Sequence, residues 1–405
     1  MKPTALSTRV SDRQTGHTRS TRRPASGLTV LTLSVVLIGA GNLILTAGAQ
    51  DWFGIDYLLL ATGLCALLVL VRFKHLLDNL PVMAPVLLFL ATCGVGFLSS
   101  QGTAYTASKA QTLLIVLVIT AGLAAFPDRA RVHRSIAVTL LVLGAVATIW
   151  LLIGGSVGVN GRTSLLDLNP IGVARLTGLT VVISLALLLM PSASRTRVRL
   201  RIAALLVLAL CGLVATVLTG SRGPLLAVGA GVAVMLLVVM RRRRFGPVPI
   251  VLLAAFSVAG YAAVASYGGD GLGRLESGVD SGRGLLYEQT WDLIRQRPWT
   301  GIGWGNVPAY IFDFASDTGS LYPHNVLLEV WVEGGILALI GFVGLCVVAL
   351  VRLTRASADQ PWSLACLGLL VFALSSAQFS SDIVGNRLMW LMLCLAVLSS
   401  HRVRR

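Results

Sequence analysis

Residues 325–351 read NVLLEVWVEGGILALIGFVGLCVVALV, an apolar run whose only charged side chains are the carboxylates of Glu329 and Glu333. A run of about 18 or more predominantly apolar residues is long enough to cross a bilayer as a helix. The same signal recurs along the chain, in which 55% of the residues are hydrophobic and only 12% are charged. Soluble domains carry about 25% charged residues, so the composition predicts an integral membrane protein and excludes a soluble enzyme.

Only helices and closed barrels satisfy their backbone hydrogen bonds in lipid, and the apolar runs have helical lengths. We therefore predict an all-α polytopic membrane protein with about 12 transmembrane helices. The predicted spans are 28–48, 56–71, 81–99, 111–126, 135–153, 171–190, 202–218, 224–240, 247–267, 325–351, 362–380 and 386–400. Residues 1–27 are polar, basic and aperiodic, which predicts a disordered cytoplasmic tail. Residues 28–405 then form a single transmembrane domain whose principal extracytoplasmic loop is 268–324.

The basic residues predict the orientation of the chain in the membrane. If the N-terminus is cytoplasmic, 24 of the 33 Lys and Arg residues fall in inside segments, which is a strong positive-inside signal. Both termini are then cytoplasmic. The basic runs are read as stop signals that contact anionic lipid, not as a nucleic-acid site. Arginine outnumbers lysine 30 to 3, which fits a GC-rich bacterial genome and hence a bacterial cytoplasmic membrane.

The six cysteines all fall within the predicted spans. They have no metal-ligand spacing, and no pair of them lies in an outside loop. This pattern favours small packing residues over a disulfide framework or a metal site.

Two outside arginines run against this charge trend and need another explanation. Arg222 lies in the hairpin 219–223, and Arg283 lies in or just before the first turn of an amphipathic helix that Pro298 ends. That helix is expected to lie on the outer leaflet. A cation is unfavourable at the positive end of a helix dipole unless an anion binds there too. Because guanidinium groups bind phosphate oxygens bidentately, the pair predicts a diphosphate clamp. The alternative for Arg222 is a side chain that snorkels to lipid headgroups.

The run 325–351 is preceded by Tyr322-Pro323-His324. Asn325, Glu329 and Glu333 follow at a spacing that places them on one helix face. Histidine titrates near neutrality and is suited to proton abstraction, and carboxylates inside a span are site candidates by default. Two alternatives stay open: an interfacial histidine without a catalytic role, and a structural salt bridge between the carboxylates and an outside arginine.

These residues together resemble the O-antigen ligase and polymerase superfamily of bacterial membrane proteins. The resemblance rests on the pattern Arg283…Trp291…Arg297-Pro298…Gly301-Ile302-Gly303-Trp304-Gly305…Tyr322-Pro323-His324-Asn325…Leu328-Glu329…Glu333-Gly334-Gly335. The hairpin Thr219-Gly220-Ser221-Arg222-Gly223 resembles the family's other arginine hairpin. Arg162 with Asp167-Leu168-Asn169-Pro170 resembles its earlier Arg…Asn-Pro loop.

The resemblance implies a GT-C-like, metal-independent glycosyltransferase without a cofactor. Such an enzyme moves a glycan from an undecaprenyl-diphosphate carrier to the hydroxyl of a glycan, lipid or wall acceptor on the outer face. By matched position, Arg222 and Arg283 would bind the diphosphate and His324 would be the general base. The supporting residues would be Arg162, Asn325, Glu329 and Glu333.

Three other functions are alternatives to this ligase. A polymerase that extends carrier-linked repeat units is not separated from it by the sequence. A lipid or glycan transporter would need internal repeats and polar groups on the cytoplasmic side, whereas the polar groups here lie on one side. A purely structural protein leaves the outside arginines and Glu329 unexplained.

Overall fold

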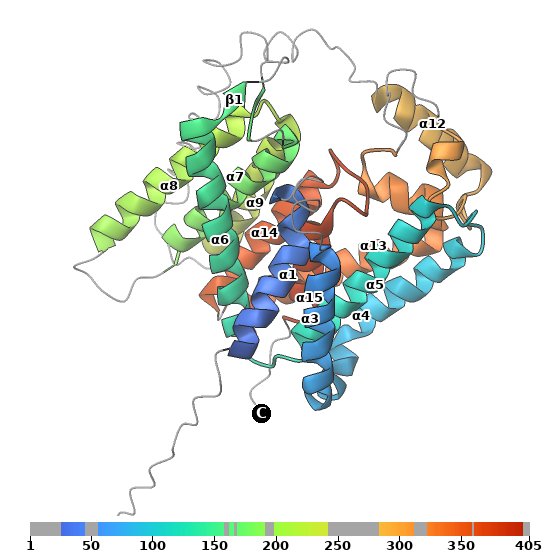
Figure 1. Ribbon diagram of the computed structural model, residues 1–405, viewed down its shortest axis with the longest axis horizontal. Helices are drawn as coiled ribbons and strands as arrows, with labels where there is room; N and C mark the ends of the chain where they lie inside the picture. The colour runs from blue at the N-terminus through green and yellow to red at the C-terminus, as the bar shows by residue number, and fades with distance from the viewer. Residues whose placement is uncertain are drawn as a thin grey trace, which may run out of the picture.

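The computed structural model shows an all-α protein whose helices pack into one membrane-type bundle (Figure 1). The structure describes residues 26–44, 56–157, 162–165, 168–190, 198–241, 283–311, 322–358 and 360–399. The predicted N-terminal tail therefore lies almost wholly outside the described residues. The same holds for the predicted span 247–267 and for parts of the predicted loop 268–324.

The helices account for most of the described chain. They are α1 Ser26–Ile44, α3 Tyr57–Val71, α4 Phe73–Phe97, α5 Ala104–Ala124, α6 Arg129–Gly154, α7 Pro170–Leu188, α8 Val198–Leu218, α9 Arg222–Arg241, α12 Arg283–Gln296, η1 Val307–Ala309 (a 3₁₀ turn), α13 Val326–Ala356, α14 Pro361–Ser376 and α15 Arg387–Val397. Two short strands, β1 Ser156–Val157 and β2 Thr163–Ser164, pair antiparallel.

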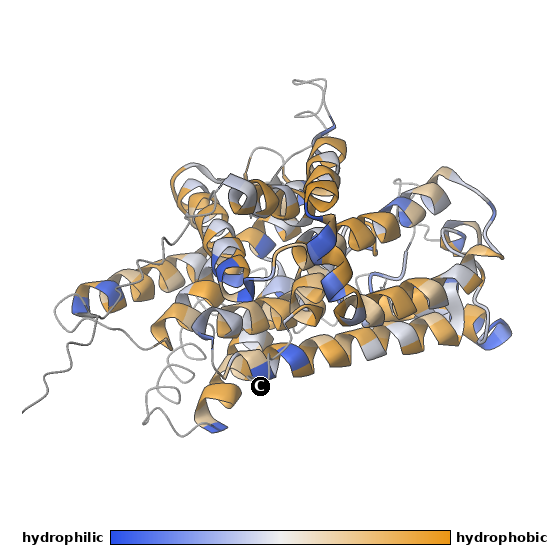
Figure 2. Cartoon of the chain, turned by 90° about the horizontal axis from the view of Figure 1, so that it is seen from below, coloured by the Kyte–Doolittle hydropathy of each residue, from blue (hydrophilic) through white to orange (hydrophobic). Residues whose placement is uncertain are grey.

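Eight of the described helices are long and apolar enough to cross a membrane: α1, α4, α5, α6, α7, α8, α9 and α13. The helices α3, α14 and α15 occupy three further predicted spans but are shorter, at 15, 16 and 11 residues. The polytopic, all-α prediction is thus confirmed, whereas the count of twelve stays a prediction. In Figure 2 the helices are mainly hydrophobic along their lengths, and hydrophilic residues gather towards their ends.

Helix α7 lies at the centre of one half of the bundle, because its residues from Val173 to Ala186 are all buried. It packs against α6, α8, α9 and α14. Two of these neighbours, α9 and α14, approach each other closely at glycines. A methyl group added to Gly231 of α9 would lie 2.7 Å from the carbonyl oxygen of Gly368 on α14. Small residues at such contacts are the usual means by which membrane helices gain packing energy.

Helix α13 is interrupted at Gly335, whose backbone adopts φ 74° and ψ −177°. The segment 298–303 satisfies the backbone groups that the break releases. Ile302 N–H donates to the Val332 carbonyl at 2.8 Å, and Ile336 N–H donates to the Pro298 carbonyl at 3.0 Å. Non-helical backbone at membrane depth is tolerated where protein covers it. Residues 298–303 provide that cover for the break in α13.

The glycines of the Gly-Ile-Gly-Trp-Gly motif have a structural function. Gly301, Gly303 and Gly305 all have positive φ, a conformation that glycine adopts without steric cost. The motif inserts the fully buried Trp304, whose indole N–H donates to the Cys93 carbonyl on α4 at 2.9 Å. The backbone carbonyl of Trp304 accepts a hydrogen bond from the Thr106 hydroxyl on α5 at 2.9 Å. The motif thereby locks α4, α5 and α13 together.

Helix α12 packs its apolar face on protein. Leu286, Leu293 and Ile294 form a cluster with Val332 of α13 and with Ile302. The sequence predicted this amphipathic helix and its apolar face correctly. Helix α13 covers much of this apolar surface, and the position of α12 at the outer leaflet stays a prediction.

Candidate functional site

The loop between α14 and α15, residues 377–386, organises the candidate site, and Arg175 of α7 anchors it. The Arg175 guanidinium donates from Nε to the Ser376 hydroxyl at 2.9 Å. It also donates from Nη2 to the Ser380 carbonyl at 3.0 Å and to Oδ1 of Asn386 at 2.9 Å. The side chain is buried, and burying a guanidinium is favourable only when its donors are satisfied. Arg175 therefore fixes both ends of this loop.

Asp382 in the middle of the loop is also buried and fully engaged. Its Oδ2 accepts from the Tyr105 hydroxyl of α5 at 2.6 Å, and its Oδ1 accepts from Gly385 N–H at 2.8 Å. The preceding residue, Ser381, has φ 65°. A left-handed conformation is uncommon for a residue other than glycine, and here the Asp382 contacts on its C-terminal side hold it in place.

A buried ion cluster joins α5 to α13 directly beneath this loop. Lys109 Nζ lies 2.8 Å from Oε1 of Glu329 and is also paired with Oε2 of Glu333. All three side chains are fully buried. The other oxygen of Glu329, Oε2, accepts from Ile383 N–H at 3.0 Å. The cluster thus connects two helices with the α14–α15 loop, and breaking such a buried pair is costly because it leaves an uncompensated charge.

The structure resolves one of the alternatives that the sequence left open for Glu329 and Glu333. They do form a salt bridge, but with Lys109 and not with an outside arginine. The predicted span 111–126 excluded Lys109, whereas α5 begins at Ala104 and carries it inwards. The sequence signal that could have identified Lys109 is its position directly before an apolar run. Arg175, Tyr105 and Asp382 were not singled out as site residues, because nothing local in the sequence connects them.

His324 lies in a tight turn at the entrance to α13. Its backbone has φ 54°, and its ring centroid lies 4.4 Å from that of Tyr322. Among the described residues, His324 and Ser381 are the non-glycine residues with positive φ. Left-handed residues other than glycine cost about 1–3 kcal/mol and cluster at functional sites. Ser381 lies in the α14–α15 loop, and His324 lies two residues before Val326, which bonds to that loop at Ala377.

Asn325 caps α13, since its side-chain oxygen accepts from the N–H groups of Leu327 and Leu328 at 3.0 and 3.1 Å. This contact satisfies donors that the first helical turn leaves free. The cap ends the turn that carries His324 and so fixes the backbone of this turn relative to α13.

Arg222 reaches the same loop from another direction. It is the first residue of α9, and its side chain is exposed. A methyl group added to the next residue, Gly223, would lie 2.7 Å from Cβ of Phe379 in the α14–α15 loop. On the other side of the loop, Val326 N–H donates to the Ala377 carbonyl at 3.3 Å. The Arg222 hairpin and the His324 turn therefore flank residues 377–379.

Arg162 adjoins the same hairpin. A methyl group added to Gly220 would lie 3.3 Å from Cγ of Arg162. The segment that carries Arg162 is held by the β1–β2 pair, in which Val157 is the partner of Thr163. Asp167 lies outside the described residues, whereas Asn169 caps α7 through its contact with Ile171 N–H at 2.9 Å.

The structure places Arg283 as the first residue of α12. The rings of Trp291 and Trp331 lie 5.4 Å apart, so α12 packs against the first half of α13. Arg283 is eight residues before Trp291, or about 12 Å along α12, and Val326 is five residues before Trp331, or about 7.5 Å along α13. Along its own axis, each helix therefore begins within about 12 Å of this ring contact.

Figure 1 shows β1 and α12 at one end of the bundle, opposite the end at which α1 begins. The arginines at the starts of α9 and α12 and the His324 turn thus belong to one side of the protein. Both arginines stand at helix N-termini, as the sequence predicted. Within the described residues no group of three His, Cys, Asp or Glu side chains is arranged to hold a metal.

Residues 204–343 match the family model described as O-antigen ligase. The match extends from α8 to the first half of α13 and includes the arginine hairpin, α12 and the His324 turn. Arg162 lies before it. The match covers about a third of the chain and confirms the predicted resemblance to an O-antigen ligase-like family. No curated protein matches the chain.

Proposed function

We propose that this O-antigen ligase-like protein is a GT-C-like glycosyltransferase that moves a glycan from an undecaprenyl-diphosphate carrier to an acceptor hydroxyl. The family match supports a membrane glycosyltransferase of the O-antigen ligase or polymerase type. The observation that carries the finer proposal is the convergence of two structures on residues 377–379. The Arg222 hairpin meets this segment at Phe379, and Val326, two residues after His324 at the start of α13, meets it at Ala377.

The arginines fit the donor side of this reaction. As the glycosidic bond breaks, its electron pair leaves with the diphosphate, whose negative charge grows. Guanidinium groups fixed before the reaction stabilise that charge without rearrangement. Arg222 and Arg283 also add the positive ends of α9 and α12 to the same anion. This arrangement would supply the charge stabilisation from the protein itself, so the proposed reaction is metal-independent.

His324 fits the acceptor side. The acceptor oxygen forms a bond to the anomeric carbon while the bond from that carbon to the diphosphate oxygen breaks. The hydroxyl proton passes to the imidazole, which must lie within hydrogen-bond reach of it. The left-handed turn, the Tyr322 ring and the Asn325 cap position the His324 ring. Glu329 and Glu333 are engaged by Lys109, which favours His324 as the proton acceptor.

The diphosphate clamp predicts that Arg222→Lys and Arg283→Lys each lower transfer strongly. An ammonium group keeps the charge but cannot form the two parallel hydrogen bonds of a guanidinium. The measurement is the rate of glycan transfer from a purified carrier-linked donor by the full-length protein in lipid vesicles. It is made with and without EDTA, because the proposed reaction is metal-independent.

Arg241→Lys is the matched control, because Arg241 is an exposed arginine at the opposite end of α9. Membrane yield should be equal for all variants. If both Lys variants and both Ala variants transferred glycan at the wild-type rate, the clamp would be wrong.

The proposed topology places both termini in the cytoplasm, with Arg222, Arg283 and His324 on the outer face of the bacterial cytoplasmic membrane. Asp292→Cys on the exposed face of α12 should then react with an impermeant maleimide in intact cells. Arg131→Cys at the start of α6 should react only after lysis. Both side chains are more than half exposed, at 56% and 78%, so access is not limited by burial. The reverse pattern of labelling would contradict the orientation.

A ligase and a polymerase differ in what accumulates when the protein is removed. Loss of a ligase should leave carrier-linked polymer, whereas loss of a polymerase should leave single carrier-linked repeat units. Chain-length analysis of carrier-linked glycan in a deletion strain distinguishes them. The proposal of a ligase requires the first result.

A further inference from the structure

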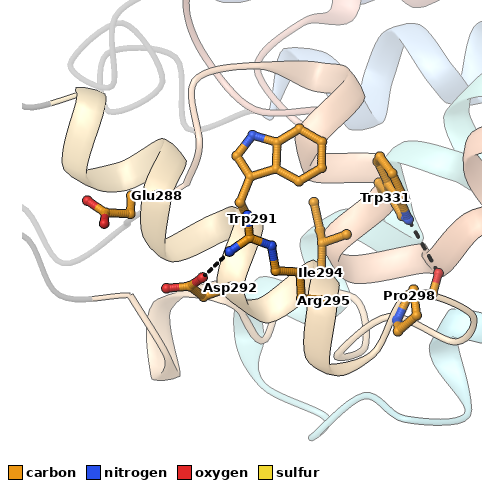
Figure 3. A pocket seen from close by; sticks show the side chains of 7 residues that line it. All are labelled: Glu288, Trp291, Asp292, Ile294, Arg295, Pro298 and Trp331. Atoms are coloured by element: carbon orange, nitrogen blue, oxygen red, sulfur yellow. Dashed lines mark hydrogen bonds and ion pairs between the residues drawn. The ribbon is translucent and has the colours of Figure 1, made fainter.

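A cleft of about 600 Å³ lies between α12 and the start of α13, apart from the buried ion cluster. Figure 3 shows Trp291 of α12 and Trp331 of α13 side by side in the lining of this cleft, with their rings 5.4 Å apart and nearly perpendicular. Trp331 is fixed by a hydrogen bond from its indole N–H to the Pro298 carbonyl at 3.3 Å. Trp291 is 41% exposed, so a large part of its apolar side chain is open to solvent.

Charged side chains complete the lining of the cleft. Glu288 and Asp292 lie one turn apart on α12 and present carboxylate oxygens, which accept hydrogen bonds. Arg295 lies in the same lining and is paired with Asp292 at 3.2 Å. An open aromatic face beside hydrogen-bond acceptors and a donor matches a ligand that has an apolar C–H face and a rim of hydroxyls. A pyranose ring has both.

The charges distinguish a sugar from the other ligands of this membrane surface. Two carboxylates and one guanidinium give the lining a net negative charge, which repels diphosphate and anionic lipid headgroups. An aromatic side chain at a membrane interface is otherwise a common anchor. An anchor, however, needs no carboxylates beside it. Neutral sugar hydroxyls are favoured here over both alternatives.

The cleft is placed to serve the proposed reaction. Trp331 lies seven residues after His324, or about 10 Å along α13. It is two residues from Glu329 and from Glu333, which places it on the opposite face of the helix from the Lys109 cluster. A glycan whose reacting sugar lies at His324 could therefore extend along α13 into this cleft.

We propose that the Trp291–Trp331 cleft binds a sugar unit of the glycan next to the reacting sugar, as a subsite for donor or acceptor glycan. This inference rests on the proposed transferase function and names the part of the substrate that the cleft holds. Stacking on Trp291 supplies most of the contact area. Glu288, Asp292 and Arg295 select the orientation through the hydroxyls.

Equilibrium dialysis of the full-length protein in nanodiscs tests the cleft. The probe is tritium-labelled oligosaccharide released by mild acid from the carrier lipids of the cells that make the protein. Trp291→Ala should raise the Kd by about tenfold, equivalent to about 1.4 kcal/mol, whereas Trp291→Tyr should retain much of the affinity. Glu288→Gln and Asp292→Asn should each raise the Kd less.

Trp299→Ala is the matched control, because Trp299 is a 73% exposed tryptophan of the neighbouring segment that does not line the cleft. Its Kd should equal that of the wild type. If Trp291→Ala lowered only the yield of membrane-inserted protein and left the Kd unchanged, Trp291 would be an interfacial anchor and the inference would be overturned. Equal increases of Kd in the Trp291 and Trp299 variants would overturn it too.

The kinetics of glycan transfer show whether the cleft binds the donor glycan or the acceptor glycan. An acceptor subsite predicts that Trp291→Ala raises the KM for the acceptor only, and a donor subsite predicts that it raises the KM for the carrier-linked glycan only. A change in neither KM contradicts the cleft. His324→Ala should bind the oligosaccharide with wild-type Kd. Full transfer activity of the His324→Ala variant would contradict the proposed mechanism but not the proposed sugar site in the cleft.

Discussion

His324→Ala is expected to lower the rate of glycan transfer by about 10²–10⁴-fold, the usual contribution of a general base. Binding of the carrier-linked donor should change little, because the proposal assigns the diphosphate to Arg222 and Arg283. Single-turnover transfer by the purified protein measures the chemical step, and dialysis of labelled carrier measures binding. A loss of both together would indicate a collapsed turn and not a missing base.

Two further variants separate basicity from backbone strain. Alanine is disfavoured at the φ of 54° that His324 adopts, whereas asparagine tolerates the left-handed region. His324→Asn and His324→Gln keep hydrogen-bonding groups but cannot take up the proton, so both should be nearly as slow as the Ala variant.

His75→Ala is the control, since His75 lies at the start of α4, about 30 Å along that helix from Phe97, which packs against Trp304. Near wild-type rates in the Asn and Gln variants would reduce His324 to an orienting group.

Lys109→Met is expected to destabilise the protein by about 3–5 kcal/mol, the range observed when one partner of a buried ion pair is removed. Glu329 and Glu333 would remain fully buried without their cation. The measurement is the thermal unfolding midpoint of the protein in detergent, followed by size-exclusion chromatography after heating. Loss of the contact from Ile383 to Glu329 would also release the α14–α15 loop, so transfer should fall with stability.

The triple variant Lys109→Met, Glu329→Gln and Glu333→Gln tests the cause. It removes all three charges and should recover much of the lost stability, because neutral side chains of similar volume avoid the buried, unpaired carboxylates. Arg131→Met, which breaks an exposed pair with Asp128, is the control and should change stability by less than about 1 kcal/mol. A Lys109→Met protein as stable as the wild type would show that the cluster holds nothing together.

The course of the helices could be predicted from local sequence. The apolar runs locate the described spans. The period of residues 286–294 predicted most of the buried face of α12: Leu286, Thr290, Leu293 and Ile294 are buried, whereas Trp291 on the predicted face is 41% exposed. The hairpin 219–223 and the amphipathic pattern after Arg283 placed both arginines at or next to the starts of their helices. These features depend on residues three or four positions apart, so the sequence encodes them directly.

The ends of the helices were predicted less well, and that affected the site. Lys109 was placed outside its span because a charged side chain lowers the local hydropathy, although α5 begins five residues before it. Hydropathy reports the average cost of placing a residue in lipid. It does not register that Glu329 and Glu333 on another helix remove this cost for Lys109.

The sequence by itself determined a polytopic helical membrane protein that resembles the O-antigen ligase family, with arginines at two helix starts and a histidine at a third. Only the tertiary structure decided which groups meet: Lys109 with carboxylates more than 200 residues away, Arg175 with the α14–α15 loop, and Trp291 with Trp331. A helix period fixes the face on which a side chain lies. The partner on that face depends on how the helices pack, and packing is a property of the whole bundle.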